Sequence, residues 1–133
     1  MLLVTTLTAS VLAIFYVRLT FNVIRLRQKL RISLGTGGNA DLERAIRAHG
    51  NFSEYVPIAL ILLGCLEINL APALLVGPMG ALLIGGRVVH AIGVNTPSQG
   101  AAKNRVRGMV ITILTMVALV TCNLGWLIYK QLV

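Results

Sequence analysis

Four long apolar runs, separated by polar links, decide what this chain can fold into. Each run has about 20 residues or more, and a helix of that length crosses a hydrocarbon core of roughly 30 Å. Only 12% of the 133 residues are charged, whereas a typical soluble domain carries about 25%. The sequence therefore predicts one all-α integral membrane domain over residues 1–133, a four-transmembrane-helix bundle with antiparallel up-down order. We expect its helices at about 2–24, 41–69, 73–94 and 106–129.

The first apolar run resembles a signal peptide only superficially. It lacks a basic leading segment and continues to about Ile24, past the usual length of a signal-peptide core. We therefore expect it to be retained as a transmembrane helix. The net charge of +8 would favour a nucleic-acid partner in a soluble protein, but here the basic residues lie between apolar runs. In that position they set topology and meet anionic headgroups, so the expected partner is a lipid bilayer and no nucleic acid is expected.

The basic residues are concentrated in the first and third links. Those links carry Arg25, Arg27, Lys29 and Arg31, and Lys103, Arg105 and Arg107, respectively. The second link, "NLAP", has no basic residue, and Lys130 alone marks the C-terminal end. The positive-inside rule then predicts that the first and third links are cytoplasmic and that both termini lie on the non-cytoplasmic side. Some of these cations, such as Arg27, are expected to extend toward the headgroups. The compact chain suggests a bacterial inner membrane.

The second apolar run has polar residues at membrane depth. Its uncharged part, residues 55–66, spans only roughly 18 Å, which is too short to cross the hydrocarbon core. Counting about 20 residues back from Asn69 therefore places Asn51 and Glu54 inside the membrane, in its cytoplasmic half. The same count along the third run places Arg87 and His90 at a similar depth. Polar groups from several helices are thus predicted to meet at one level.

The polar residues of the second run share a helical face. Arg44, Arg47, Asn51 and Glu54 are spaced by 3, 4 and 3 residues, so they fall within roughly 60° of arc on a helix. One interpretation is a structural ion pair in which Glu54 neutralises Arg47 or Arg87. Because ionisable groups at this depth usually face a wet cavity or the protein interior, convergence from several helices favours a ligand site.

The charges predict the kind of ligand. Cations outnumber carboxylates, and the guanidinium group matches a carboxylate well, so the ligand should be anionic. A small peptide with two carboxylates and one amine would also give Glu54 a partner, whereas a phosphate compound would not. His49 and His90 could suggest a metal, but no third ligand has suitable spacing, so metal binding is not expected.

Three motifs resemble one known family. The stretch "ERAIRAHGNFSEYVP" contains R-x-x-x-N-x-x-E, formed here by Arg47, Asn51 and Glu54. "GGRVVHAIG" contains G-R-x-x-H, and "RLRQK" follows the first apolar run. Together with the order of the four helices, these motifs resemble the membrane-associated proteins in eicosanoid and glutathione metabolism, the MAPEG family.

The resemblance implies a homotrimer that binds glutathione between neighbouring subunits at the cytoplasmic side. Carried over to this chain, the glutathione-binding residues would be Arg25, Arg47, Asn51, Glu54, Arg87 and His90. An arginine at the start of the fourth helix would stabilise the glutathione thiolate, and Arg107 is the first choice, with Arg105 as the alternative. The implied activity is that of a glutathione transferase or peroxidase acting on lipophilic electrophiles or lipid hydroperoxides.

The sequence departs from the family pattern at several places. Val94 and approximately Ile111 stand where several family enzymes carry aromatic residues, and Gly50 stands where some have a further arginine. These departures keep open a non-enzymatic, lipid-binding scaffold as the alternative function. A small multidrug exporter is disfavoured, because the first helix has Arg18 and no acidic residue.

Two smaller expectations concern packing and solvent. Small residues allow helices in membranes to approach closely, so four glycines of the third run are expected at helix contacts. These are Gly77, Gly80, Gly85 and Gly86. Glu67, close to the short second link, is expected simply to reach water.

Overall fold

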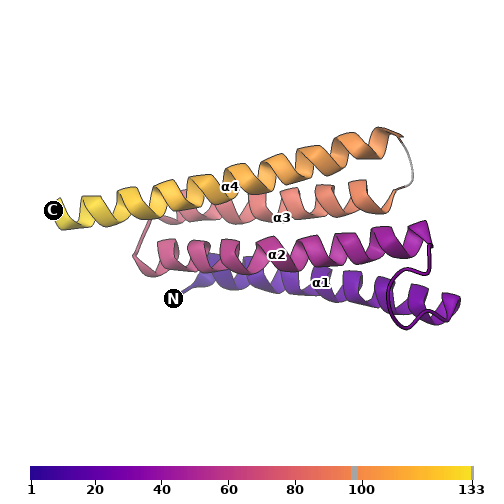
Figure 1. Cartoon of the computed structure of the whole chain (residues 1–133). Coiled ribbons are helices and arrows are strands. Elements are labelled where there is room, and N and C mark those ends of the chain that lie inside the picture. The colour runs from indigo at the N-terminus through magenta and orange to yellow at the C-terminus, as the bar shows by residue number, and fades with distance from the viewer. Residues whose placement is uncertain (97–98, 133) are drawn as a thin grey trace.

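Four helices make up nearly all of the computed structural model, which describes residues 1–96 and 99–132. They are α1 (Leu3–Leu30), α2 (Ala40–Ile68), α3 (Ala73–Asn95) and α4 (Gln99–Leu132). The helices run alternately up and down, and both termini lie at the same end of the bundle (Figure 1). Each helix is long and apolar enough to cross a membrane. The predicted all-α, four-helix membrane bundle is therefore confirmed.

Two helices are longer than the apolar pattern predicts. Helix α1 continues through the basic run to Leu30 and ends at Arg31, whose φ of 55° is left-handed and whose N–H donates to the carbonyl oxygens of Arg27 and Gln28. Helix α4 begins at Gln99, several residues before the apolar run. Arginine, lysine, glutamine and alanine all have high helix propensity, so polar segments next to a span continue it as helix. Pro97, in the link between α3 and α4, lies outside the described residues.

Arg27 holds the first link together and does not extend toward the headgroups as expected. Nη1 of Arg27 donates to the carbonyl oxygens of Ile32, Ser33 and Gly35, at 3.4, 3.0 and 3.1 Å. Arg27 therefore folds back onto the chain and fixes the turn that leads into α2.

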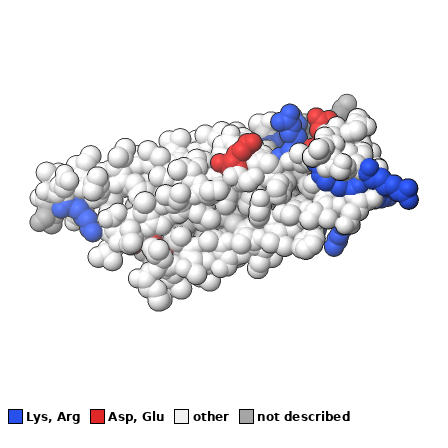
Figure 2. Space-filling model, turned by 60° about the horizontal axis from the view of Figure 1, so that its bottom comes forward, with Lys and Arg blue, Asp and Glu red and all other residues white. Residues whose placement is uncertain are grey.

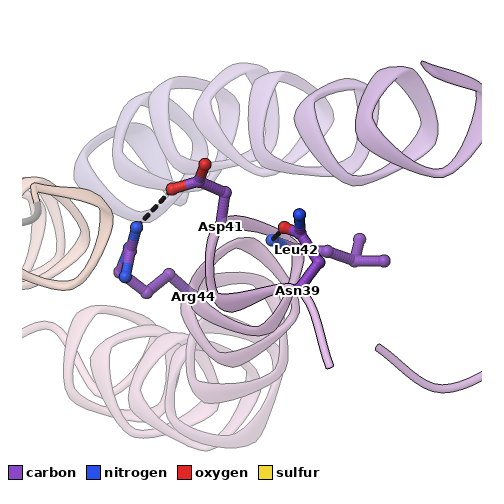
Figure 3. A network of polar contacts seen from close by, with 4 residues as sticks. All are labelled: Asn39, Asp41, Leu42 and Arg44. Carbon is purple, nitrogen blue, oxygen red and sulfur yellow. Dashed lines mark hydrogen bonds and ion pairs between the residues drawn. The ribbon is translucent and has the colours of Figure 1, made fainter. Parts of the chain in front are cut away.

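Helix α2 begins with a side-chain cap. Oδ1 of Asn39 accepts a hydrogen bond from the backbone N–H of Leu42 at 3.0 Å (Figure 3). Asp41 lies in the first turn, where a negative charge interacts favourably with the helix dipole. The cap determines where α2 starts and hence the depth of every polar residue that follows on this helix.

Aromatic contacts fix the register of α1 against α2. Tyr16 stacks on His49 with ring centroids 4.7 Å apart and on Phe52 at 5.7 Å. Nε2 of His49 forms a hydrogen bond with the hydroxyl of Thr20 at 3.2 Å. His49 thus faces α1, away from the polar stripe of α2, as its place on the helical wheel predicts.

Glycines bring α3 close to its neighbours, though only some of those expected to do so. A Cβ at Gly80 would lie 2.5 Å from Oγ1 of Thr8, and a Cβ at Gly86 would lie 2.9 Å from Oγ1 of Thr112. By contrast, a Cβ at Gly77 or Gly85 would meet no atom of the described residues within 4 Å. The packing role predicted for all four glycines is therefore right for two.

Glu67 caps the start of α1, and the expectation that it only reaches water is wrong. Its carboxylate accepts hydrogen bonds from the backbone N–H groups of Val4 and Thr5, at 2.8 and 2.7 Å. It also accepts one from the hydroxyl of Thr5 at 2.7 Å. The first amides of a helix have no hydrogen-bond partner within the helix. Here the Glu67 carboxylate, at the end of α2, accepts hydrogen bonds from two of them.

Replacing Glu67 with glutamine should lower the free energy of unfolding by about 1 kcal/mol, because a neutral amide has one acceptor oxygen and no charge for the amides of α1. The measurement is unfolding of both proteins in mixed detergent micelles. Thr5→Val, which removes only the hydroxyl contact, should have a smaller effect. Unchanged stability of Glu67→Gln would show that the cap contributes nothing.

Candidate functional site

A cleft of about 1000 Å³ opens at the end of the bundle opposite the termini. One wall is α2, and the other is formed by the end of α3 and the start of α4. The four residues of the predicted polar stripe, Arg44, Arg47, Asn51 and Glu54, all line it. The 3-4-3 spacing in the sequence therefore corresponds to one surface of a real cavity.

The α2 wall carries charges of both signs. The Arg44 guanidinium pairs with the Asp41 carboxylate, one turn closer to the start of the helix (Figure 3). Glu43 lies on the cleft together with Arg47 and Glu54. Gly50 also lines this wall and places no side chain in the cleft.

The opposite wall is built from a contact between α3 and α4. Nδ1 of His90 donates a hydrogen bond to the carbonyl oxygen of Arg105 at 2.9 Å. Both residues line the cleft, together with Val94. Because Nδ1 is engaged, Nε2 is the ring atom of His90 that remains for a ligand.

Gly108 makes this wall possible, and no sequence pattern had indicated it. A Cβ at Gly108 would lie 2.6 Å from Cα of His90 and 2.7 Å from the carbonyl oxygen of Gly86. The two backbones therefore touch, which sets the position of the start of α4 against the histidine.

Arg87 is placed differently from the prediction that it contacts a ligand. Its side chain is fully buried, and Nη2 donates to Oδ1 of Asn51 at 2.6 Å. Its guanidinium carbon lies 5.8 Å from the ring centroid of Phe52 and 5.7 Å from that of Tyr55. Arg87 thus lies behind the cleft wall and donates a hydrogen bond to Asn51, which forms part of that wall.

Arg25 and Arg107 lie apart from the other predicted site residues. Both are exposed, on α1 and α4 respectively, and neither is among the residues that line the cleft within the chain. Of the two arginines considered for the thiolate, the chain by itself brings Arg105 to the cleft.

The cleft also includes residues that the sequence reasoning missed. They are Ala40, Glu43, Ile46, Gly93, Thr96 and Ala102. Glu43 could have been found, because it precedes Arg47 by four residues and so shares its face. The remaining residues are small or apolar, or lie at a helix end, and their place depends on how α3 and α4 pack.

Charge is distributed unevenly over the molecule. In Figure 2, most of the visible Lys, Arg, Asp and Glu side chains lie toward one end of an otherwise uncharged surface. At that end, the cleft collects three arginines (Arg44, Arg47 and Arg105) and two glutamates (Glu43 and Glu54). Such a mixed set suits a ligand that carries carboxylates and an amine.

A bundle of four membrane-length helices with a mixed-charge cleft at one end defines an integral membrane protein with a polar cleft. Comparison with known proteins adds its family. The model of the MAPEG family matches residues 5–125. The chain is also 35% identical over 125 residues to the inner membrane protein YecN of Escherichia coli K12, covering 94% of this chain and 93% of YecN. YecN of Escherichia coli O6:H1 gives the same values.

The chain therefore belongs to the MAPEG family. The resemblance inferred from Arg47, Asn51 and Glu54 is confirmed at the level of the family. The four apolar helices and the similarity to an inner membrane protein together support an integral inner membrane protein.

Proposed function

We propose that this protein binds glutathione in the cleft between α2, α3 and α4. The bound thiolate would react with a lipophilic electrophile or a lipid hydroperoxide, so that the protein acts as a glutathione transferase or peroxidase. One observation carries the proposal: Arg47, Asn51 and Glu54 of α2 line the same cleft as His90 and Arg105. Membership of a family named for eicosanoid and glutathione metabolism supports it.

The charges of the cleft complement those of glutathione. The tripeptide has two carboxylates, which Arg44 and Arg47 can bind through the planar guanidinium fork. It has one ammonium group, for which Glu54 and Glu43 are the available carboxylates on the same wall. The volume of about 1000 Å³ is at the upper end of the range for small-molecule sites.

An arginine beside the sulfur would supply the chemistry. A free thiol is mostly protonated at neutral pH, and a neighbouring cation lowers the thiol pKa and raises the thiolate fraction. In conjugation with a lipophilic halide, the thiolate sulfur forms a bond to the electrophilic carbon while the carbon–halogen bond breaks and the halide ion leaves. In peroxide reduction, it attacks one peroxide oxygen to release the alcohol, and a second glutathione then yields the disulfide and water. Arg105 lines the cleft, and Arg107 remains the alternative.

A homotrimer would complete the site. Arg25 and Arg107 are exposed and lie outside the cleft of their own chain, so a neighbouring subunit could bring them to it. The basic residues at this end of the bundle support an orientation with the cleft facing the cytoplasm and both termini on the other side. Water-soluble glutathione would then meet substrates dissolved in the bilayer.

Equilibrium dialysis of labelled glutathione with the detergent-purified protein tests the proposal. We expect saturable binding that unlabelled glutathione displaces and its diethyl ester displaces about tenfold less well, because the ester masks both carboxylates. Absence of binding at millimolar glutathione by the folded protein would contradict the proposal.

A lipid-binding scaffold without turnover is the second candidate. It is favoured by Gly50 and Val94, which line the cleft and are smaller than the arginine and aromatic residues of several family enzymes. Conjugation of a lipophilic halide or reduction of a lipid hydroperoxide by the glutathione-bound protein would exclude this candidate. Glutathione binding without either reaction would favour it.

A further inference from the structure

We propose that Arg87 is a positioning residue that acts on the ligand through Asn51. The proposal rests on the proposed function, because it assigns how one residue of the glutathione cleft is oriented. It departs from the expectation, drawn from the sequence, that Arg87 itself binds the ligand.

The environment of Arg87 separates it from the cleft. Its side chain has 0% exposure and lies between α2 and α4. The guanidinium group is placed near the rings of Phe52 and Tyr55, and Nη1 lies 3.5 Å from the hydroxyl oxygen of Thr112. Phe52 is itself packed against Phe15 at a centroid distance of 5.8 Å. These contacts leave the guanidinium group no direct path to a ligand.

A structural ion pair does not account for Arg87. Where side chains are described, in residues 1–96 and 102–132, the ion pair within 4.0 Å joins Arg44 and Asp41, so Arg87 makes no ion pair within that distance. The short contact of the guanidinium group is the 2.6 Å bond to Oδ1 of Asn51. A buried arginine is costly in a membrane protein, and here its strongest interaction is with a residue of the cleft.

This bond determines what Asn51 offers to a ligand. An asparagine amide has one acceptor oxygen and two N–H donors. Since Oδ1 points toward Arg87, the NH₂ group on the other side of the amide is the part placed to meet a ligand in the cleft, which Asn51 lines. Asn51 is thereby fixed as a donor and should bind an acceptor of the ligand, such as a carboxylate or peptide carbonyl oxygen.

A double-mutant cycle on glutathione affinity tests the inference. We expect Asn51→Ala and Arg87→Met each to weaken binding about tenfold. If Arg87 acts through Asn51, the double variant should also bind about tenfold less tightly than the wild type, because the second change removes nothing further. Independent contacts would multiply to about a hundredfold, and that outcome would overturn the inference.

Thr112→Val is the matched control, because it removes a hydroxyl next to Arg87 and leaves the bond to Asn51 intact. It should change the affinity by less than about twofold. A loss as large as that of Arg87→Met would mean that any disturbance behind the wall weakens binding, which contradicts a positioning role. If Arg87→Met does not fold, Arg87→Lys replaces it in the same cycle. A double variant whose loss of affinity equals the product of the two single losses would again overturn the inference.

The cycle also separates this inference from the proposed function. A wild-type protein that binds no glutathione contradicts the proposed function itself. Wild-type binding with an additive cycle contradicts only the role of Arg87.

Discussion

Asn51→Asp should weaken glutathione binding about a hundredfold, or roughly 2.7 kcal/mol, without destabilising the protein. The change keeps the shape of the side chain and replaces its NH₂ donor with an oxygen. A new carboxylate can still accept the bond from Arg87, and the two residues then form an ion pair. On the cleft side, however, it has no hydrogen to donate and repels the anionic ligand.

The measurement is the dissociation constant of labelled glutathione, taken beside the thermal unfolding of the same preparations. Asn51→Ala is the informative comparison, because it removes the donor but adds no charge, and it should bind more tightly than Asn51→Asp. Wild-type affinity in Asn51→Asp would show that the amide N–H groups of Asn51 do not meet the ligand.

Gly108→Ala should lower the free energy of unfolding by about 3 kcal/mol, because the added methyl has no room. Its Cβ would lie 2.6 Å from Cα of His90 and 2.7 Å from the carbonyl oxygen of Gly86. These are backbone atoms, which cannot move aside as a flexible side chain can, so α3 and α4 must separate. The separation would also disturb the bond between His90 and Arg105.

Gly125→Ala is the control on the same helix. A Cβ at Gly125 would meet no atom of the described residues within 4 Å, and alanine has the higher helix propensity, so stability should stay within about 1 kcal/mol of the wild type. Unfolding of both variants in mixed micelles makes the comparison. Equal stabilities would contradict the close contact assigned to Gly108.

The fold could be predicted because apolar run length and helix count are tied to membrane thickness. The polar stripe could be predicted for a similar reason, since the 3-4-3 spacing of Arg44, Arg47, Asn51 and Glu54 requires one face on any helix. The ends of α1 and α4 were predicted less well. Hydropathy indicates which residues lie in the lipid. The polar residues beyond them have high helix propensity, so both helices extend past the apolar runs.

Other features depend on packing that a single sequence does not encode locally. Counting residues placed Arg87 level with Asn51, which it contacts. The direction of its guanidinium group, however, depends on where Phe52, Tyr55 and Thr112 lie. Nothing in the sequence distinguishes Gly108 from other helical glycines, because its importance comes from the contact with the His90 backbone. Glu67 likewise caps α1 only because the end of α2 lies next to the start of α1.

A structure of the protein in lipid nanodiscs at saturating glutathione would show directly whether the cleft binds the tripeptide. We expect tripeptide density in the cleft, with its carboxylates toward Arg44 and Arg47 and an acceptor oxygen within hydrogen-bond distance of the Asn51 amide. An empty cleft, or glutathione bound elsewhere, would show that the cleft is not the glutathione site.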